Sequence, residues 1–355
     1  MDRHAIIEAI AGNETLENLD LSGVDLSGAD LAGGRFENVV FDRADFRKAK
    51  ITRTGFRNCR FSGALFDDTD LTRVDLRKMN LSGAFFRRAL MHETLFSASD
   101  LSGCDFSGAR VSWSIMQEAN LSGALFVGAD FEKAVLQNAN CEGADFSGAT
   151  IYKTIFVNAR LRGAVLRAKK MDKVLLAGCG LAGQNFSGMH FREVNFSGAN
   201  LCGADFRGAE ISNCAFTGAD MSDARLDGAI ARQSMFYQAI LTSAILEKAD
   251  LAQSCLNEAN LEDAVFRGAV LESASLEKVR ATRADFTGCN CRYMNLGHAD
   301  ISNAVFRDAA LYMAFVHKTL DEGVDWDKAV HATFRGAPAG LAEAENWQPP
   351  ASVPD

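Results

Sequence analysis

Residues 119–151 read ANLSG ALFVG ADFEK AVLQN ANCEG ADFSG ATI. The third residue of each group of five, beginning with Leu121, Phe126 and Phe131, is apolar. The same phase runs without a break from Leu16 to Val316, over 61 positions that hold mostly leucine and phenylalanine and no polar residue. Self-similarity at a fixed short period indicates a repeat architecture in which successive units stack on one another. The sequence therefore predicts a long, linear core rather than a globular one.

Each five-residue unit has a recurring order around its apolar centre. The residue two before the centre is usually alanine, a polar residue stands between them, and a pair such as Ser122-Gly123 follows. In an extended segment, residues two apart point to the same side, so the small residue and the centre should face inward. Glycine accepts a positive φ at little steric cost, so the following pair should turn the chain. Each unit is thus predicted to form one short side and one corner.

A longer period, equal to four of these units, is superimposed on the period of five. Small positions such as Thr94 and Ser114 form one column that mostly avoids alanine, while the other columns favour it. Most phenylalanine centres fall in two columns that lie two units apart, one of which contains Phe86, Phe106 and Phe126. A period of five alone would not separate these columns, so we expect four units, and hence four sides, in each coil.

The repeating unit resembles the Ala-(Asp/Asn)-Leu-X-X motif of the pentapeptide-repeat family, as in Ala29-Asp30-Leu31. The resemblance covers residues 16–316 of the 355. It implies an all-β fold, a right-handed quadrilateral (four-sided) β-helix solenoid. The 61 units would make about 15 coils, and a strand spacing of about 4.8 Å would give a rod about 70 Å long.

The segments outside the repeat predict caps for the two ends of the rod. Residues 1–15 carry isoleucines at helical spacing and predict an N-terminal capping helix. Residues 317–355 lose the strict phase and contain all four prolines, so we expect a C-terminal cap over 317–337 and a Pro-rich tail beyond it.

Nine cysteines would suggest a disulfide framework if the repeat did not explain them. Seven occupy inward positions as small apolar residues, and only Cys202 and Cys255 should face outward. We therefore expect reduced thiols and a cytoplasmic protein. No apolar run is long enough to span a bilayer and no secretory signal is evident, so any export would use a signal-peptide-independent secretion system.

No set of side chains indicates catalysis. The many aspartates occupy the outward position that the repeat itself requires. The sequence contains no phosphate-binding loop, no Ser/His/Asp set and no Cys/His pair at zinc-ligand spacing. We expect no enzyme, no catalytic residue, no cofactor and no metal.

One outward column lacks charge over five consecutive coils. The candidate interface consists of this column and one apolar corner residue, namely Leu95, Ile115, Val135, Ile155, Leu175 and Val157. The small positions on this side are threonine, serine and valine, which predicts flat, strand-like stacking. Two interpretations stay open: an exposed apolar face that binds a partner, and an outward ladder that only stabilises the stack.

Two further features stand out. The secondary candidate interface is an aromatic corner formed by Trp113, Tyr152, Tyr293 and Tyr312, because amphipathic aromatics are favoured at interfaces. The small position is violated at Lys169, Gln184 and Met189. A slot of alanine size cannot take these side chains, so we expect a bulge, a bend or a change of turn type between about 167 and 190.

The net charge of −9 conceals bands of opposite sign. Residues 35–90 carry 13 bases and 7 acids, whereas residues 193–278 carry 13 acids and 6 bases. Such bands fit either an ordinary solvated surface or the steering of a charged partner.

These observations favour a non-enzymatic, rod-like scaffold for protein–protein interaction, with an unidentified partner and a homodimer as one form of association. One alternative, implied by the resemblance, is a DNA mimic acting on a type II topoisomerase; the basic band at 35–90 opposes it. Another is an accessory or cargo-linked protein of a bacterial secretion system. Acidic flanks disfavour direct nucleic-acid binding, and no membrane association is expected.

Overall fold

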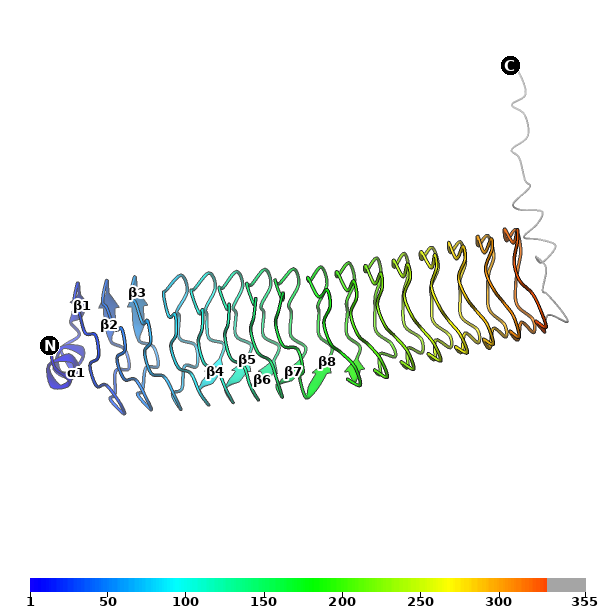
Figure 1. Ribbon diagram of the computed structural model, residues 1–355. Helices are drawn as coiled ribbons and strands as arrows, with labels where there is room; N and C mark the ends of the chain where they lie inside the picture. The colour runs from blue at the N-terminus through cyan, green and yellow to red at the C-terminus, as the bar shows by residue number, and fades with distance from the viewer. Residues whose placement is uncertain (331–355) are drawn as a thin grey trace, which may run out of the picture.

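The computed structural model describes residues 1–330, which wind into a long rod (Figure 1). Within this range the chain forms one helix, α1 (Arg3–Ala11), and nine short strands. A first parallel sheet contains β1 (Thr15–Glu17), β2 (Arg35–Glu37) and β3 (Gly55–Arg57). A second contains β4 (Leu90–His92), β5 (Arg110–Ser112), β6 (Asp130–Glu132), β7 (Thr150–Tyr152), β8 (Lys170–Asp172) and β9 (Phe191–Arg192).

A parallel register with a constant offset of four five-residue units runs along the rod. Thr15 pairs with Arg35 in the first sheet, and single-residue bridges keep the same offset as far as the pair Ala310 and Val330. Each coil of the chain therefore lies directly on the coil that follows it. The fold is an all-β solenoid of five-residue repeats.

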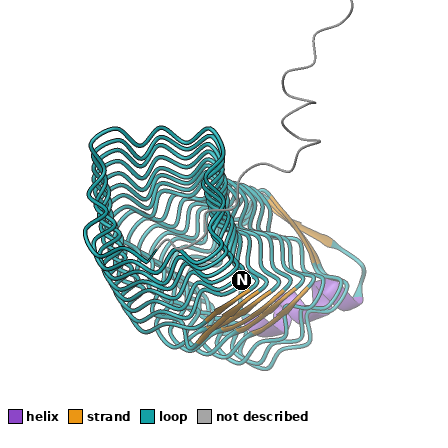
Figure 2. Cartoon of the chain, turned by 90° about the vertical axis from the view of Figure 1, so that its right-hand side faces the viewer, coloured by secondary structure: helices purple, strands orange, loops and turns teal. Residues whose placement is uncertain are grey.

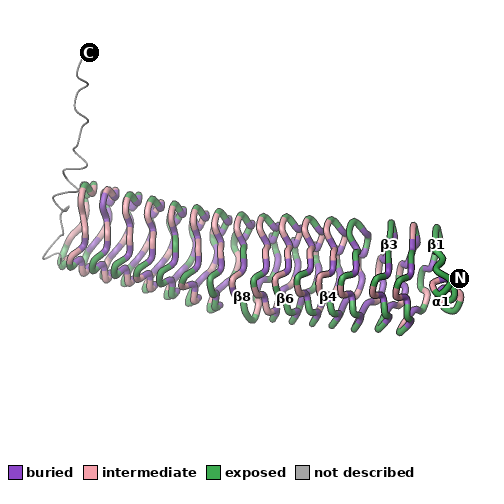
Figure 3. Tube along the Cα trace, turned by 180° about the vertical axis from the view of Figure 1, so that it is seen from behind, coloured by how far each residue is buried: buried purple, intermediate pink, exposed green. Residues whose placement is uncertain are grey.

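Burial alternates along most units as the sequence predicts (Figure 3). Leu121 and Ala124 are fully buried, whereas the residues at the corner between them are not. The second corner residue adopts a left-handed backbone, with φ of 67° at Gly123 and 56° at Lys133. The prediction of inward centres, inward small residues and turning pairs is confirmed.

The core is a ladder of stacked side chains along the axis of the rod. The rings of Phe106 and Phe126 stack with centroids 4.8 Å apart, and those of Phe126 and Phe146 follow at 4.9 Å. These distances match the spacing of paired strands, so the rings and the backbone ladder share one rise per coil.

The helix α1 covers the N-terminal end of the solenoid. The Asp2 carboxylate accepts a hydrogen bond from the backbone N–H of Ala5 at 3.0 Å and caps the helix. Ile6 is fully buried and Ala9 nearly so, which places an apolar face on the first coil. Within residues 1–330 no helix has the length and apolar character needed to cross a bilayer.

At the other end the solenoid continues beyond Val316. Leu320 pairs with Asp300 and Val330 with Ala310, so the repeat extends into the residues that the sequence assigns to the cap. The ring of Trp326 stacks on Phe306 at 4.9 Å and replaces a phenylalanine in the core ladder. The polar Asp321 breaks the sequence phase, but backbone pairing does not depend on one side chain. The expected tail at 338–355 lies outside the described residues.

The strands lie on a different part of the coil from the one expected. The sequence predicted flat, strand-like stacking at the apolar column, but the column forms single-residue bridges and β4–β9 lie in the unit before it. The two sheets occupy different positions around the rod (Figure 2). The small position after a strand is often larger than alanine, as at Val39, Cys59 and Thr94. We attribute the strand-type unit to the wider corner that such a residue needs.

Candidate interaction surface

The apolar column is brought together by the coil-to-coil register. Leu95 pairs with Ile115, Ile115 with Val135, Val135 with Ile155 and Ile155 with Leu175. Leu175 is 36% exposed, and the other four side chains are half-buried. Every member points away from the core, so five consecutive coils present an uncharged, apolar row to solvent.

Buried hydroxyl groups fix the backbone behind this column. Thr94 Oγ1 donates to the carbonyl oxygen of Leu71 at 2.9 Å, and Ser114 Oγ donates to that of Met91 at 2.8 Å. Each hydroxyl is fully buried, and its hydrogen bond to the preceding coil replaces the one that it would make with water. The row of outward side chains is thereby held at a regular spacing.

One edge of the column is formed by a corner without strong charge. Val157, like Gln117 and Gln137, is half-buried along this edge. Glu118 is exposed and accepts a hydrogen bond from the Gln117 amide at 3.3 Å. The candidate interface therefore continues from the column onto this corner.

The structure splits the aromatic corner into two separate groups. Trp113 and Tyr152 lie beside the apolar column, each within three residues of one of its members, with Lys133 Nζ 4.2 Å from the Trp113 ring centroid. Tyr293 and Tyr312 contact each other edge-to-face, with centroids 5.8 Å apart. At about 4.8 Å per coil these two groups lie some nine coils, or about 43 Å, apart. Only the first group extends the candidate interface.

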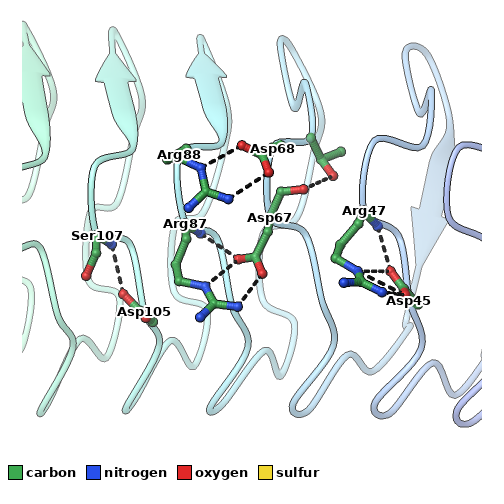
Figure 4. Close-up of polar contacts among 9 residues, drawn as sticks. Asp45, Arg47, Asp67, Asp68, Arg87, Arg88, Asp105 and Ser107 are labelled. Atoms are coloured by element: carbon green, nitrogen blue, oxygen red, sulfur yellow. Dashed lines mark hydrogen bonds and ion pairs between the residues drawn. The ribbon is translucent and has the colours of Figure 1, made fainter.

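The basic band is largely compensated by ion pairs along and between coils (Figure 4). Arg87 pairs with the nearly buried Asp67 at 2.6 Å, and the adjacent Arg88 pairs with Asp68 at 2.7 Å. The hydrogen bond from Arg88 lowers the pKa of the Asp68 carboxyl below its ordinary value. Exposed ion pairs of this kind contribute about 0–1 kcal/mol each. They order the surface arginines more than they stabilise the fold.

The coil ladder is interrupted at two places, and a cleft opens at each. At the first, β3 pairs with β2, but no bridge joins Gly55 to Asp75 in the next coil. The first cleft, of about 560 Å³, lies there and is lined by residues that include Phe56, Arg57, Arg77, Lys78 and Met79. The sequence interpretation did not identify it. Met79 occupies a small position, and this is the signal that would have revealed it.

The second interruption contains the three side chains for which the sequence predicts a bulge or bend. No bridge joins Val165 to Asn185, and the turn expected at 167–168 is absent. Lys169 is exposed, and its backbone N–H bonds the Ala149 carbonyl at 2.8 Å instead of closing a corner. Gln184 Nε2 donates to the carbonyl oxygen of Ala164 at 3.0 Å.

The two longer side chains are therefore accommodated differently. Gln184 is half-buried and bonds to the preceding coil, while Met189 stays in the core at 8% exposure. The second cleft, of about 430 Å³, opens in the unit where no bridge joins Lys170 to His190, and its lining includes Lys169 and Phe191.

All nine cysteines are free, and their burial follows the repeat. Seven are buried, and only Cys202 and Cys255 are partly exposed, which confirms the predicted orientation. Within residues 1–330 no group of three or more His, Cys, Asp or Glu side chains is placed to hold a metal ion.

The family model described as "Pentapeptide repeats (8 copies)" matches residues 20–58, 53–88, 69–108, 114–151, 129–167, 171–208, 209–247, 244–280 and 282–319. The chain belongs to the pentapeptide-repeat family, whose members are structural repeat proteins. A comparison with curated protein sequences finds no match.

Several solved structures are similar to this chain. A trypsin-treated variant of QnrB1, a plasmid-mediated fluoroquinolone resistance protein, is 20% identical over 62% of this chain and 83% of its own, with a TM-score of 0.25. HetL from Nostoc sp. strain PCC 7120, a pentapeptide repeat protein involved in the regulation of heterocyst differentiation, is 22% identical over 75% of this chain and 91% of its own, with a TM-score of 0.15. A thylakoid-lumen protein from Arabidopsis thaliana is 29% identical over 33% of this chain and 70% of its own, with a TM-score of 0.21. The family assignment rests on the repeat model and not on these structures.

Proposed function

We propose that this protein is a non-enzymatic, rod-like scaffold that binds a protein partner through the apolar column and its Trp113/Tyr152 edge. The observation that carries the proposal is the row of five outward apolar residues on consecutive coils, from Leu95 to Leu175. Each of the other outward columns contains charged residues over the same coils, such as Asp100, Asp105 and Arg110. A flat apolar row is what a partner can cover without desolvating charge.

The edge of the column supports the same proposal. Trp113 is 50% exposed and Tyr152 half-buried, and both carry a polar group beside an apolar ring. Aromatic side chains of this kind are enriched at the centres of interfaces, where they bury a large area with few rotatable bonds. Together the column and edge run for about 20 Å along the rod.

We also infer the cross-section and the extent of the rod. The coil-to-coil register contains four five-residue units, each with a left-handed corner residue, which supports four sides per coil. At this register residues 16–316 amount to about 15 coils, and the family resemblance implies a right-handed winding. The nine free cysteines support a cytoplasmic location, because reducing compartments keep thiols unpaired.

The alternatives require different surfaces. A DNA mimic presents negative charge along its rod, and the net positive band at 35–90 disfavours that role here. No feature of residues 1–330 favours the secretion-system alternative over a general scaffold.

The proposal is tested with the double variant Ile115→Lys/Ile155→Lys. Both side chains face outward, so circular dichroism should show an intact solenoid. Two unpaired charges in an apolar interface are costly to desolvate, so the association seen with the wild type in pull-down and light scattering should be lost.

The matched control is Leu125→Lys/Val165→Lys. These two residues are each 41% exposed, are also two coils apart and lie on another side of the rod. The control adds the same charge and should keep every association. An equal loss of association in both double variants would assign the effect to net charge. Full association of the Ile115→Lys/Ile155→Lys variant would mean that the column only stabilises the stack of coils.

A further inference from the structure

The second cleft adjoins the Trp113/Tyr152 edge, because Tyr152 pairs with Asp172, which lines the cleft. It opens where Lys170 and His190 fail to pair, and its volume is about 430 Å³. Phe191 also lines it, but its side chain stays in the core at 3% exposure. The other lining groups include the side chains of Lys169, Lys170 and Arg192.

The cleft carries surplus positive charge. Its lining contains three bases and two acids. Asp172 is already paired with Lys170 at 2.9 Å, and Glu193 is shared between Lys173 at 3.2 Å and Arg192 at 3.6 Å. Lys169 is exposed and makes no ion pair within residues 1–330.

One further carboxylate faces the cleft. Glu210 lines it and accepts a hydrogen bond from the backbone N–H of Ser212 at 3.1 Å. It offsets one of the lysines, but Lys169 and the shared Arg192 remain as partners for an incoming anion. An occupant that carries carboxylates would match these cations.

We propose that the occupant is the segment 338–355 of the same chain. This segment contains Glu343, Glu345 and Asp355, no lysine or arginine, and one aromatic residue, Trp347. Its carboxylates complement Lys169 and Arg192. The proposal goes beyond the scaffold function, because it assigns a ligand from the same chain to a cleft beside the proposed interface.

The register of the solenoid brings the start of this segment to the correct side. Val330 pairs with Ala310, and the same ladder of outward residues leads back, one coil at a time, to Glu210 and His190 beside the cleft. The last described residue and the cleft therefore share one side of the rod. Seven coils separate Val330 from His190, a distance of about 34 Å.

The chain is long enough to cover that distance. Glu343 is thirteen residues beyond Val330, and in extended form that stretch spans about 43 Å. The first cleft, which is also basic, lies farther away, more than twelve coils or about 60 Å from Val330. The second cleft is therefore the nearer of the two to the segment.

The test is zero-length carbodiimide cross-linking of the full chain, read by peptide mass spectrometry. The reagent joins a carboxylate to an amine only where the two are in contact, so Glu343 or Glu345 should become linked to Lys169 or Lys170. An equimolar mixture of ¹⁴N- and ¹⁵N-labelled protein separates links within one chain from links between two. We expect links of a single isotope, with a yield at least tenfold lower in 500 mM than in 50 mM NaCl because the contacts are ionic.

Two variants and one internal standard complete the test. Lys169→Glu with Arg192→Glu should reduce the links from the segment to Lys170 at least tenfold, while Lys78→Glu in the first cleft should leave them unchanged. The native pair Asp30 and Lys50, 2.9 Å apart, reports that the reagent works in every sample.

Three results would overturn the proposal: mixed-isotope links only, links spread evenly over exposed lysines such as Lys248 and Lys278, or links that survive the double variant. The Ile115→Lys/Ile155→Lys variant should keep the links, so failure of the scaffold proposal is distinguished from failure of this one.

Discussion

At the corner of nearly every five-residue unit, one residue holds a positive φ that only glycine adopts without strain. Gly103 has a φ of 64°, and a Cβ atom there would meet nothing within 4 Å. The cost of Gly103→Ala is therefore conformational, and we expect a loss of about 1 kcal/mol in the free energy of unfolding.

The control is Gly180→Ala, which also meets nothing within 4 Å but lies outside the left-handed region. It should be neutral or stabilising by up to about 1 kcal/mol, because alanine restricts the unfolded chain. Urea titrations of the two variants measure both values. Equal effects would contradict the assignment of residue 103 to a strained corner.

Buried thiols make the protein sensitive to high pH. Burial raises the pKa of Cys104 to about 12, and the pKa of Cys141 likewise to about 12. In the unfolded chain a thiol ionises near pH 8.5. Above that pH the unfolded chain releases protons that the folded chain keeps, so stability is fully present below about pH 8 and falls as pH rises toward 12.

The variant Cys104→Ala isolates this effect, because alanine already fills the equivalent small position at Ala84 and Ala124 in the neighbouring coils. We expect its denaturation midpoint to fall less than that of the wild type between pH 8 and pH 10.5. If the denaturation midpoints of the wild type and the variant change equally with pH, the pKa of the Cys104 thiol is the same in the folded and unfolded chain, which would contradict this account.

The stacked phenylalanine column is the element that holds successive coils together. Phe126 is fully buried between Phe106 and Phe146. Replacing it by alanine should leave a cavity and cost about 3–5 kcal/mol. The outward Gln137→Ala should cost less than about 0.5 kcal/mol. Chemical denaturation of both variants measures the difference, and similar midpoints would contradict the orientation of the unit.

The second interruption should be the least protected part of the rod. The amides of Gly163 and Leu166 donate no hydrogen bond to the next coil, whereas the equivalent Gly123 and Phe126 donate at 2.8 and 2.7 Å. Hydrogen–deuterium exchange should therefore be faster at the first pair by more than tenfold. Uniform protection across both pairs would mean that the coils are continuous there.

The element scale also shows how far sequence reasoning extends. The inward positions could be predicted because burial at a fixed period leaves a clear apolar record, as in the column of Phe126. The two interruptions of the coil ladder are harder to predict from the sequence, because each depends on single residues such as Met79 and Lys169. The position of the strands depends on the width of a corner, to which side chains of two coils contribute, and one sequence column does not report it.

At the scale of the whole molecule, the solenoid places residues that are 20 apart in sequence next to one another on one face of the rod. The coil-to-coil register aligns Leu95, Ile115 and Val135, which are distant in sequence, into one row. The column could be predicted once the register was known, because each outward residue occupies a fixed place in its unit. The separation of Trp113 from Tyr293 follows from the same register, but the contact of Lys133 with the Trp113 ring required side-chain coordinates.

The most direct measurement of the central claim places a photo-reactive benzoylphenylalanine at Val135, in the middle of the apolar column, in cells that produce the protein. The matched site is Leu125, which faces outward on another side of the rod in the same region. Irradiation should yield one covalent adduct of defined mass from position 135 and none from position 125. The same adduct from both positions, or no adduct from position 135, would contradict the assignment of the apolar column as the partner-binding face.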